Sequence, residues 1–203
     1  MADMVYTKEY TAPPYSRREI RRYSGMTQEG PEEAALLAEC LRELEGRLVY
    51  RACWREFAVS VAGDEIDLGF VRVSSASLAK HLAGCSRAVI FAATVGAQLD
   101  RLILRYNTAS PAKALLFDTV GTERIEALCD TVCGDFENEY AKSGLVTRPR
   151  FSPGYGDLPL SLQKDIFAVL DCPKKIGVSL GAGLLMTPAK SVTAIVGVGY
   201  ENN

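Results

Sequence analysis

A short segment rich in arginine, proline and glycine holds the residues whose types and spacing best suit ligand binding. Residues 148–159 read Arg-Pro-Arg-Phe-Ser-Pro-Gly-Tyr-Gly-Asp-Leu-Pro. Because prolines fix some backbone angles and glycines free others, we predict a shaped loop with backbone N–H and C=O groups open to a polar ligand. Arg150 can hold a carboxylate through two hydrogen bonds, and Tyr155 can lie against a cation or a flat ring. The same composition also fits an ordinary connection between helices with a solvated arginine.

The cysteines and the single histidine point away from a metal site and from a histidine-based catalytic triad. Cys129 and Cys133 are four residues apart in a helical pattern, so their side chains share one helix face. His81 is the only histidine, which leaves too few ligands for zinc and no imidazole base beyond this one. In a chain of this length without an export signal, we expect reduced thiols in or near the core. The six cysteines are Cys40, Cys53, Cys85, Cys129, Cys133 and Cys172.

Composition and charge are those of an ordinary globular protein. The 203 residues are 48% hydrophobic and 24% charged, and 23 basic against 25 acidic side chains leave a net charge of −2. This balance gives no general attraction to nucleic acid or anionic lipid. No apolar stretch reaches the roughly 18 residues that a membrane span needs. The first residues lack the basic and apolar regions of a signal peptide, so we expect a cytoplasmic protein.

One local charge asymmetry lies in residues 17–23, which read Arg-Arg-Glu-Ile-Arg-Arg-Tyr. At helical spacing the arginines share one side, while Ile20 and Tyr23 face another way. A solvated amphipathic helix accounts for this pattern. The alternative is a docking face for an acidic partner protein.

The spacing of apolar residues predicts an α+β fold, with helices flanking a mainly antiparallel, twisted sheet. We predict an irregular N-terminal arm over residues 1–15 and a single domain over residues 16–203. Capping residues and helical periodicity predict helices at 16–23, 31–46, 77–82, 96–106, 110–141 and 161–170. Alternating patterns predict a hairpin that turns at 63–64, and we also predict a buried strand at 88–93 and a last strand at 191–198. A glycine-rich strand-to-helix turn is missing, which argues against a Rossmann-type dinucleotide or methyltransferase site.

Several motifs with a fixed spacing carry a family resemblance. The loop follows the pattern Arg150-x-x-Pro153-Gly154-Tyr155-x-x-x-Pro159, and residues 185–194 read Leu-Met-Thr-Pro-Ala-Lys-Ser-Val-Thr-Ala. Upstream lies Asp118-x-x-Gly121-Thr122-x-x-x-Glu126-Ala127-Leu128, and residues 19–25 read Glu-Ile-Arg-Arg-Tyr-Ser-Gly. Together these motifs resemble the activation domain of vitamin B12-dependent methionine synthase, in its free-standing form.

This resemblance implies an accessory function in methionine biosynthesis. In that family the domain binds S-adenosylmethionine, which remethylates the cobalamin of the synthase after a reduced flavoprotein has supplied an electron. For this chain the resemblance implies S-adenosylmethionine as ligand and cobalamin carried by a partner. That partner would be a cobalamin-binding methionine synthase or a related corrinoid protein, served by a flavodoxin- or ferredoxin-type electron donor.

The resemblance also assigns roles to residues. Arg150 falls at the family's arginine that holds the carboxylate of S-adenosylmethionine, and Glu126 falls at the glutamate that receives its ammonium group. Ser152 and Gly154 match positions whose backbone meets the ligand, and Tyr155 matches the tyrosine beside it. A zwitterionic ligand requires one fixed cation and one fixed anion, which agrees with this assignment.

Some alternatives stay open. Arg148 competes with Arg150 for the carboxylate, although the spacing favours Arg150. A non-catalytic adaptor could dock a corrinoid protein or a flavoprotein through residues 17–22 and bind no small ligand. An unrelated S-adenosylmethionine-dependent methyltransferase is disfavoured by the missing glycine-rich turn. Because 203 residues suffice for one domain of the synthase, we expect an accessory module acting in trans, with no catalytic residue or metal ligand of its own.

Overall fold

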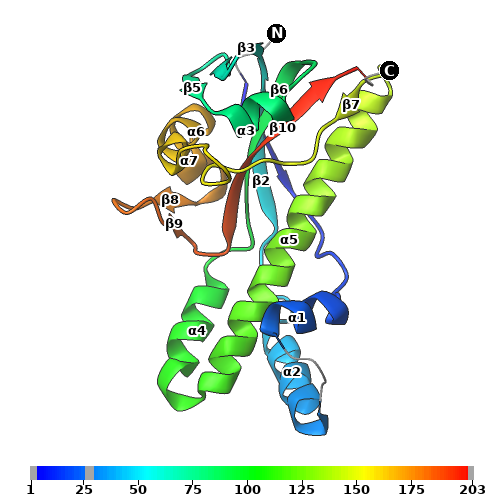
Figure 1. Ribbon diagram of the computed structural model, residues 1–203. Helices are drawn as coiled ribbons and strands as arrows, with labels where there is room; N and C mark the ends of the chain where they lie inside the picture. Colours follow the sequence, from blue (N-terminus) through cyan, green and yellow to red (C-terminus); the bar gives the residue numbers. More distant parts are fainter. Residues whose placement is uncertain (1–3, 26–29, 201–203) are drawn as a thin grey trace.

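The computed structural model describes residues 4–25 and 30–200, and over these residues its centre is a five-stranded antiparallel sheet (Figure 1). The central pair runs antiparallel from Ser191 opposite Thr94 to Val198 opposite Arg87. The predicted α+β class with an antiparallel sheet is therefore confirmed. In spatial order the strands are β1 (Tyr6–Glu9), β2 (Arg51–Ala58), β6 (Cys85–Thr94), β10 (Ser191–Gly199) and β7 (Val146–Thr147).

Two separate hydrophobic cores cover the two faces of this sheet. Along β6, Val89 and Phe91 belong to one core, whereas Ile90 and Ala92 belong to the other. Successive side chains of a strand point to opposite faces, so the unbroken apolar run of β6 supplies both cores at once. The sheet is thus a middle layer that separates two groups of helices.

The first group of helices is built around a helix of 31 residues, α5 (Pro111–Ala141). Figure 1 shows α5 running beside the sheet and extending past it, with α4 on one side and α1 and α2 on the other. Proline in the first turn of α2 and α5 fits the helix N-terminus, where its missing N–H costs nothing. The other helices of this group are α1 (Arg17–Ser24), α2 (Pro31–Leu44) and α4 (Gln98–Ala109).

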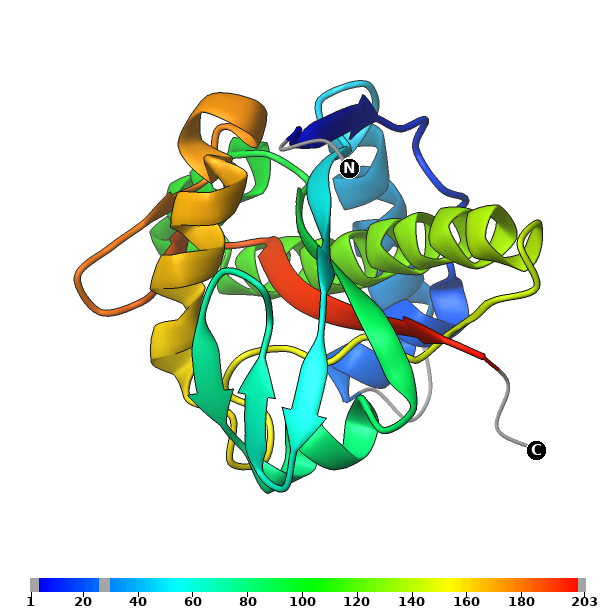
Figure 2. The ribbon, with the colours of Figure 1, turned by 90° about the horizontal axis from the view of Figure 1, so that it is seen from above.

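Short helices and two small sheets cover the opposite face, as Figure 2 shows for α6 and α7. The helices are α3 (Ala76–His81), a 3-10 turn at Leu160–Leu162, α6 (Gln163–Leu170) and α7 (Cys172–Ile176). The small sheets are β3 (Ser60–Ala62) with β4 (Glu65–Asp67) and β5 (Arg72–Ser74), and β8 (Ser179–Leu180) with β9 (Met186–Thr187).

The predicted irregular arm is wrong for residues 6–9, which form the edge strand β1 and pair with β2 in register, Tyr6 opposite Trp54. All four residues of β1 are exposed, so no alternation of apolar and polar residues marks the strand in the sequence. Residues 1–3 of that arm lie outside the described residues.

A buried ion pair in α5 fastens the chain that follows β1. Arg124 Nε donates to Glu123 at 2.6 Å, and the arginine is fully buried. Arg124 also donates to the carbonyls of Pro13 and Pro14, the latter at 2.9 Å. The Ser16 N–H donates to Glu123 at 3.0 Å, so this pair also sets the start of α1.

Most predicted helices and strands are confirmed, with shifts of a few residues at their ends. The hairpin prediction is right about the turn between β3 and β4 but wrong about Phe57, which lies in β2 of the main sheet. The elements α7, β8 and β9 were not predicted, because they are too short to show a period. All six cysteines are free, as predicted. Within the described residues, none of the helices has the length and apolar character to cross a membrane.

Candidate functional site

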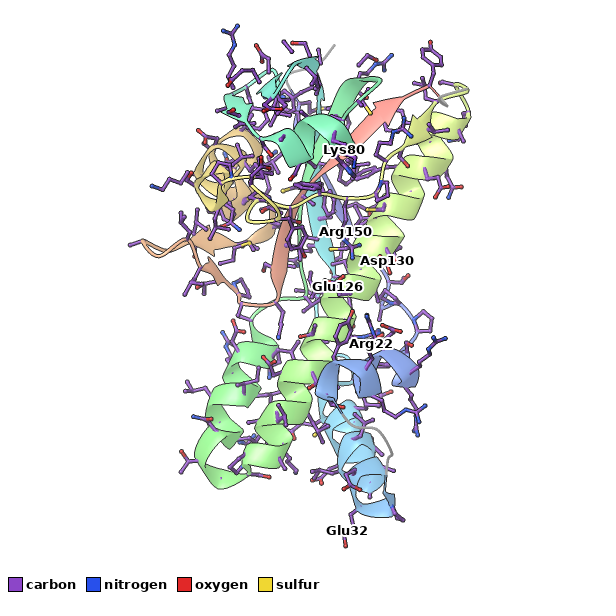
Figure 3. The ribbon with its side chains drawn as sticks, in the orientation of Figure 1. Arg22, Glu32, Lys80, Glu126, Asp130 and Arg150 are labelled. Atoms are coloured by element: carbon purple, nitrogen blue, oxygen red, sulfur yellow. The ribbon has the colours of Figure 1, made fainter. Side chains whose placement is uncertain are left out.

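Arg150 and Glu126, the predicted cation and anion of the site, lie in direct contact (Figure 3). Arg150 Nη2 donates to Glu126 Oε2, and Arg150 Nη1 donates to Asp130 Oδ1 at 2.7 Å. The Arg150 side chain is 25% exposed, against 37% for Glu126 and 74% for Asp130. One guanidinium thus faces two carboxylates at a partly open surface.

Two distant segments bring these side chains together. Glu126 and Asp130 are one helical turn apart on α5, so both point to the same side. Arg150 belongs to the loop, whose backbone is hydrogen-bonded to β10 both before and after Arg150. The Arg148 N–H donates to the Gly197 carbonyl at 2.8 Å, and Phe151 exchanges backbone hydrogen bonds with Ile195 at 2.9 and 2.8 Å. The sheet therefore fixes the backbone that presents Arg150 to α5.

Asp130 was not predicted as a site residue from the sequence. Its position four residues after Glu126 was the available signal, because a helix places such residues side by side. With Asp130 included, the three side chains carry one positive and two negative charges. Desolvation opposes the charge of Arg150, but Cys129, Asp130 and Glu126 outweigh it and raise its pKa above the ordinary value, so Arg150 is a permanent cation.

Cys129 and Cys133 lie close to this cluster but show no sign of reactivity. Burial raises the pKa of both thiols, against the opposing charge of Arg150. Because the thiolate is the reactive and metal-binding form, both cysteines behave as packing residues. Within the described residues there is no group of three His, Cys, Asp or Glu side chains placed to hold a metal.

The α1 helix adds Tyr23 to the surroundings of Glu126. Burial and the charge of Glu126 are the first two causes that raise the pKa of Tyr23. The Tyr23 hydroxyl accepts a hydrogen bond from Arg22 Nη2 at 2.8 Å, and Arg22 also pairs with Glu19. Figure 3 shows Arg22 on the side of the site that faces α1. From the sequence, this helix was interpreted only through its charged face, and no connection with Glu126 was predicted.

The backbone around Ser152 and Gly154 is closed on itself more than predicted. The Gly154 N–H donates to the Leu158 carbonyl at 2.9 Å, and the Tyr155 N–H donates to the Ser152 carbonyl at 3.1 Å. The N–H groups of Gly154 and Tyr155, which were expected to point outward, are therefore used inside the loop. Gly154 has a φ of +93°, a conformation that favours glycine. A ligand that meets this turn would face its carbonyls and the Cα of Gly154.

Tyr155 is 63% exposed. Its ring packs edge-on against Phe151, with ring centroids 6.2 Å apart. Phe151 therefore supports the Tyr155 ring on one side, and most of the ring surface is exposed to solvent. The predicted placement beside a ligand stays a prediction.

Asp157, which the sequence analysis did not single out, fastens the far end of the loop to α3. Its carboxylate accepts from the Ser75 hydroxyl at 2.5 Å and from the N–H groups of Ala76 and Ser77 at 2.7 and 3.1 Å. The hydrogen bond from Ser75 is the largest of the causes that hold the pKa of Asp157 below its usual range. Gly156 permits this close approach, because a Cβ there would lie 2.5 Å from Ser77 Oγ.

The second motif of the resemblance packs against α5 on the same side of the sheet as Arg150. Lys190 Nζ contacts Thr122 Oγ1 and Asp118 Oδ1, both at 2.9 Å. A Cβ at Gly121 would lie 3.0 Å from the Lys190 side chain, so glycine makes room for it. Ser191 Oγ donates to the Pro188 carbonyl at 2.7 Å. These residues hold the start of β10 against α5.

The structure separates the two arginines that competed for the carboxylate. Arg150 lies with Glu126 and Asp130 on the α5 side of the sheet. Arg148 lines a pocket with Lys80 and His81 on the α3 side. Of the two, Arg150 alone is next to the predicted anion.

Comparison with solved structures finds a similar protein over nearly the whole chain. It is described as the crystal structure of the MetH reactivation domain bound to AdoHcy, with a TM-score of 0.68 at 14% sequence identity. The match covers 98% of this chain and 80% of that one. No family model matches the sequence, and no curated protein matches it. The chain has the fold of a methionine synthase activation domain, as the resemblance implied.

Proposed function

We propose that the chain binds S-adenosylmethionine and supports the reductive remethylation of cobalamin on a B12-dependent methionine synthase that acts in trans. The observation that carries this proposal is the meeting of Arg150 with Glu126 and Asp130 at a partly open surface. The similar solved domain has AdoHcy bound, and AdoHcy has the same amino-acid end as S-adenosylmethionine.

The charges of the site fit that amino-acid end. Its carboxylate needs a cation with a planar pair of donors, which Arg150 has. Its ammonium group needs an anion, and Glu126 is the less exposed of the two carboxylates. In the present arrangement Arg150 donates to both carboxylates, one through each Nη, so a ligand carboxylate that binds through both nitrogens has to displace both of them. Glu126, once released, is then free to accept the ammonium group.

The remaining residues of the proposal shape the surroundings of the ligand. Tyr155 offers an exposed ring beside the loop. Ser152 and Gly154 lie in a turn in which the Gly154 N–H donates to Leu158 and the Ser152 carbonyl accepts from Tyr155. When bound, S-adenosylmethionine supplies the methyl group. The chain itself holds and orients the ligand.

The proposal includes two protein partners. One is a cobalamin-binding methionine synthase or a related corrinoid protein, which carries the cobalamin. The other is a flavodoxin- or ferredoxin-type electron donor. Tyr155 and the neighbouring loop are the surface that we assign to the corrinoid partner, because they lie exposed beside the ligand residues.

Calorimetry with the purified chain tests the ligand assignment. We expect S-adenosylmethionine and S-adenosylhomocysteine to bind, and methylthioadenosine, which lacks the amino-acid end, to bind far more weakly. Arg150→Ala removes charge-assisted hydrogen bonds that are worth about 1.5–3 kcal/mol, or about 10- to 150-fold in affinity.

Arg72→Ala is the matched control, because Arg72 is an exposed arginine that pairs with Asp67 at 2.9 Å in another part of the chain. This variant should bind S-adenosylmethionine like the parent. Equal binding by the parent and by Arg150→Ala would refute the site. Repeating the titration with a corrinoid protein present separates a site that needs its partner from a site that does not exist.

A further inference from the structure

A cationic pocket lies on the opposite face of the sheet from Arg150. Ile195 belongs to the core on the α3 side, so Gly197, two residues further along β10, faces the same side. A Cβ at Gly197 would lie 3.3 Å from Arg148 Cγ and 2.8 Å from Cys85 Sγ. Gly197 therefore leaves the space through which the Arg148 side chain crosses β10 towards α3.

The pocket has a volume of about 400 Å³ and a cationic lining. Lys80 and Arg148 are basic side chains, and Ser77 adds a hydroxyl that also bonds to Asp157. His81 Nε2 donates to the Pro149 carbonyl at 2.6 Å, and its ring lies 5.1 Å from that of Phe151. The lining residues are Ser77, Lys80, His81, Ala83, Arg148 and Phe151, and none of them carries a carboxylate.

The positive charge of this pocket is not neutralised by the part of the chain that the structure describes. Within residues 4–25 and 30–200, neither Lys80 nor Arg148 forms an ion pair, and the buried Nη2 of Arg148 has no hydrogen-bond partner. Asp157 of the same loop is already bound by Ser75 and by the start of α3. A buried guanidinium donor without an acceptor costs free energy, and an anion that accepts from the accessible part of the same guanidinium would offset that cost.

We propose that this pocket binds a phosphoryl group, held by Lys80 and Arg148. A phosphoryl dianion matches two cations, whereas a carboxylate supplies one negative charge. The oxygens of the phosphoryl group can also accept from a guanidinium and a hydroxyl at the same time. The group comes either as free phosphate or as a phosphate monoester. The site is independent of the proposed S-adenosylmethionine site.

His81 gives a direct readout, because it is the only histidine of the chain. Its imidazole resonances are followed by NMR at about pH 7.5, where the lowered pKa of His81, set by burial and by Arg148, keeps the ring neutral. The probes are inorganic phosphate, phenyl phosphate and benzoate. We expect both phosphates to shift the His81 resonances to saturation, with benzoate at least about tenfold weaker. Tighter binding of phenyl phosphate than of inorganic phosphate identifies a monoester site, and the reverse order identifies a site for free phosphate.

Two variants test the assigned residues against a control. Lys80→Met and Arg148→Met should each weaken phosphate binding by about tenfold or more. Lys164→Ala, which removes an exposed lysine from α6, should leave it unchanged. The proposal is overturned if neither phosphate gives a saturable shift, if benzoate binds equally well, or if both methionine variants bind like the parent. If Arg148→Met does not fold, Lys80→Met alone decides, because Lys80 is exposed.

Discussion

Asp130 competes with the proposed ligand for Arg150. Removing its charge should therefore raise the affinity for the ligand rather than lower it. Arg150 Nη1 donates to Asp130 at 2.7 Å, and a ligand carboxylate that binds through both guanidinium nitrogens has to displace this contact. We therefore expect Asp130→Asn to bind S-adenosylmethionine more tightly than the parent does.

The exposure of the two side chains sets the size of the effect. Asp130 is 74% exposed and Arg150 25%, so the pair is screened by solvent. Exposed ion pairs of this kind contribute about 0.2–1 kcal/mol. Removing the competitor should therefore tighten ligand binding by about 1.4- to 5-fold. Raising the salt concentration should reduce the difference between parent and variant.

Calorimetry on the parent and on Asp130→Asn measures this change. Asp135→Asn is the matched control, because Asp135 lies further along α5 and pairs with Lys8 at 2.6 Å. It should leave the affinity for S-adenosylmethionine unchanged. A clear loss of affinity in Asp130→Asn would show that Asp130, rather than Glu126, holds the ammonium group, and it would refute the competition argument.

Three further predictions concern the stability of the fold. Arg124→Met should lower the free energy of unfolding by about 3–5 kcal/mol in urea titrations, because it leaves Glu123 buried without its partner; a loss below about 1 kcal/mol would contradict this. Gly156→Ala should cost about 1–2 kcal/mol, because φ is +56° and the new methyl group would collide with Ser77. If Gly156→Ala were neutral in a thermal melt, the close approach to α3 would be wrong. The pKa of Asp157 is lower in the folded chain than its ordinary value of 3.8, so its contribution to stability is full above that value and is lost as the pH falls further. The stability difference between the parent and Asp157→Asn should therefore shrink in unfolding curves recorded below about pH 4, and a constant difference would contradict the assignment.

Much of the fold could be predicted from local patterns. Helical spacing and proline at the first turn marked α2 and α5, and an unbroken apolar run marked β6. Patterns of this kind report burial, so they fail where an element is exposed on all sides. The strand β1 is such a case, since backbone pairing with β2 holds it and none of its side chains is buried.

The site could be predicted only in part, for a related reason. The resemblance correctly predicted that Arg150 and Glu126 lie close together, although they are 24 residues apart in the sequence. Which face of the sheet each loop arginine takes was not predictable from the loop itself. That choice depends on Gly197, which is distant in sequence and leaves space for Arg148. The involvement of Asp157 with α3 is equally non-local, because it joins residues 80 or more positions apart.

The loop that carries Arg150 also ends the sheet. Beyond β10, the described part of the chain adds to the sheet only the two-residue strand β7 and the segment 148–151, which bonds to β10 through Arg148 and Phe151. An open sheet edge invites pairing with the edge of another molecule, and proline and charge oppose such pairing. Pro149 has no N–H to offer, and Arg150 adds a charge between the two bonded residues. The sequence of this loop thus opposes edge-to-edge pairing at this side of the sheet, so its variants have to be compared for solubility as well as for affinity.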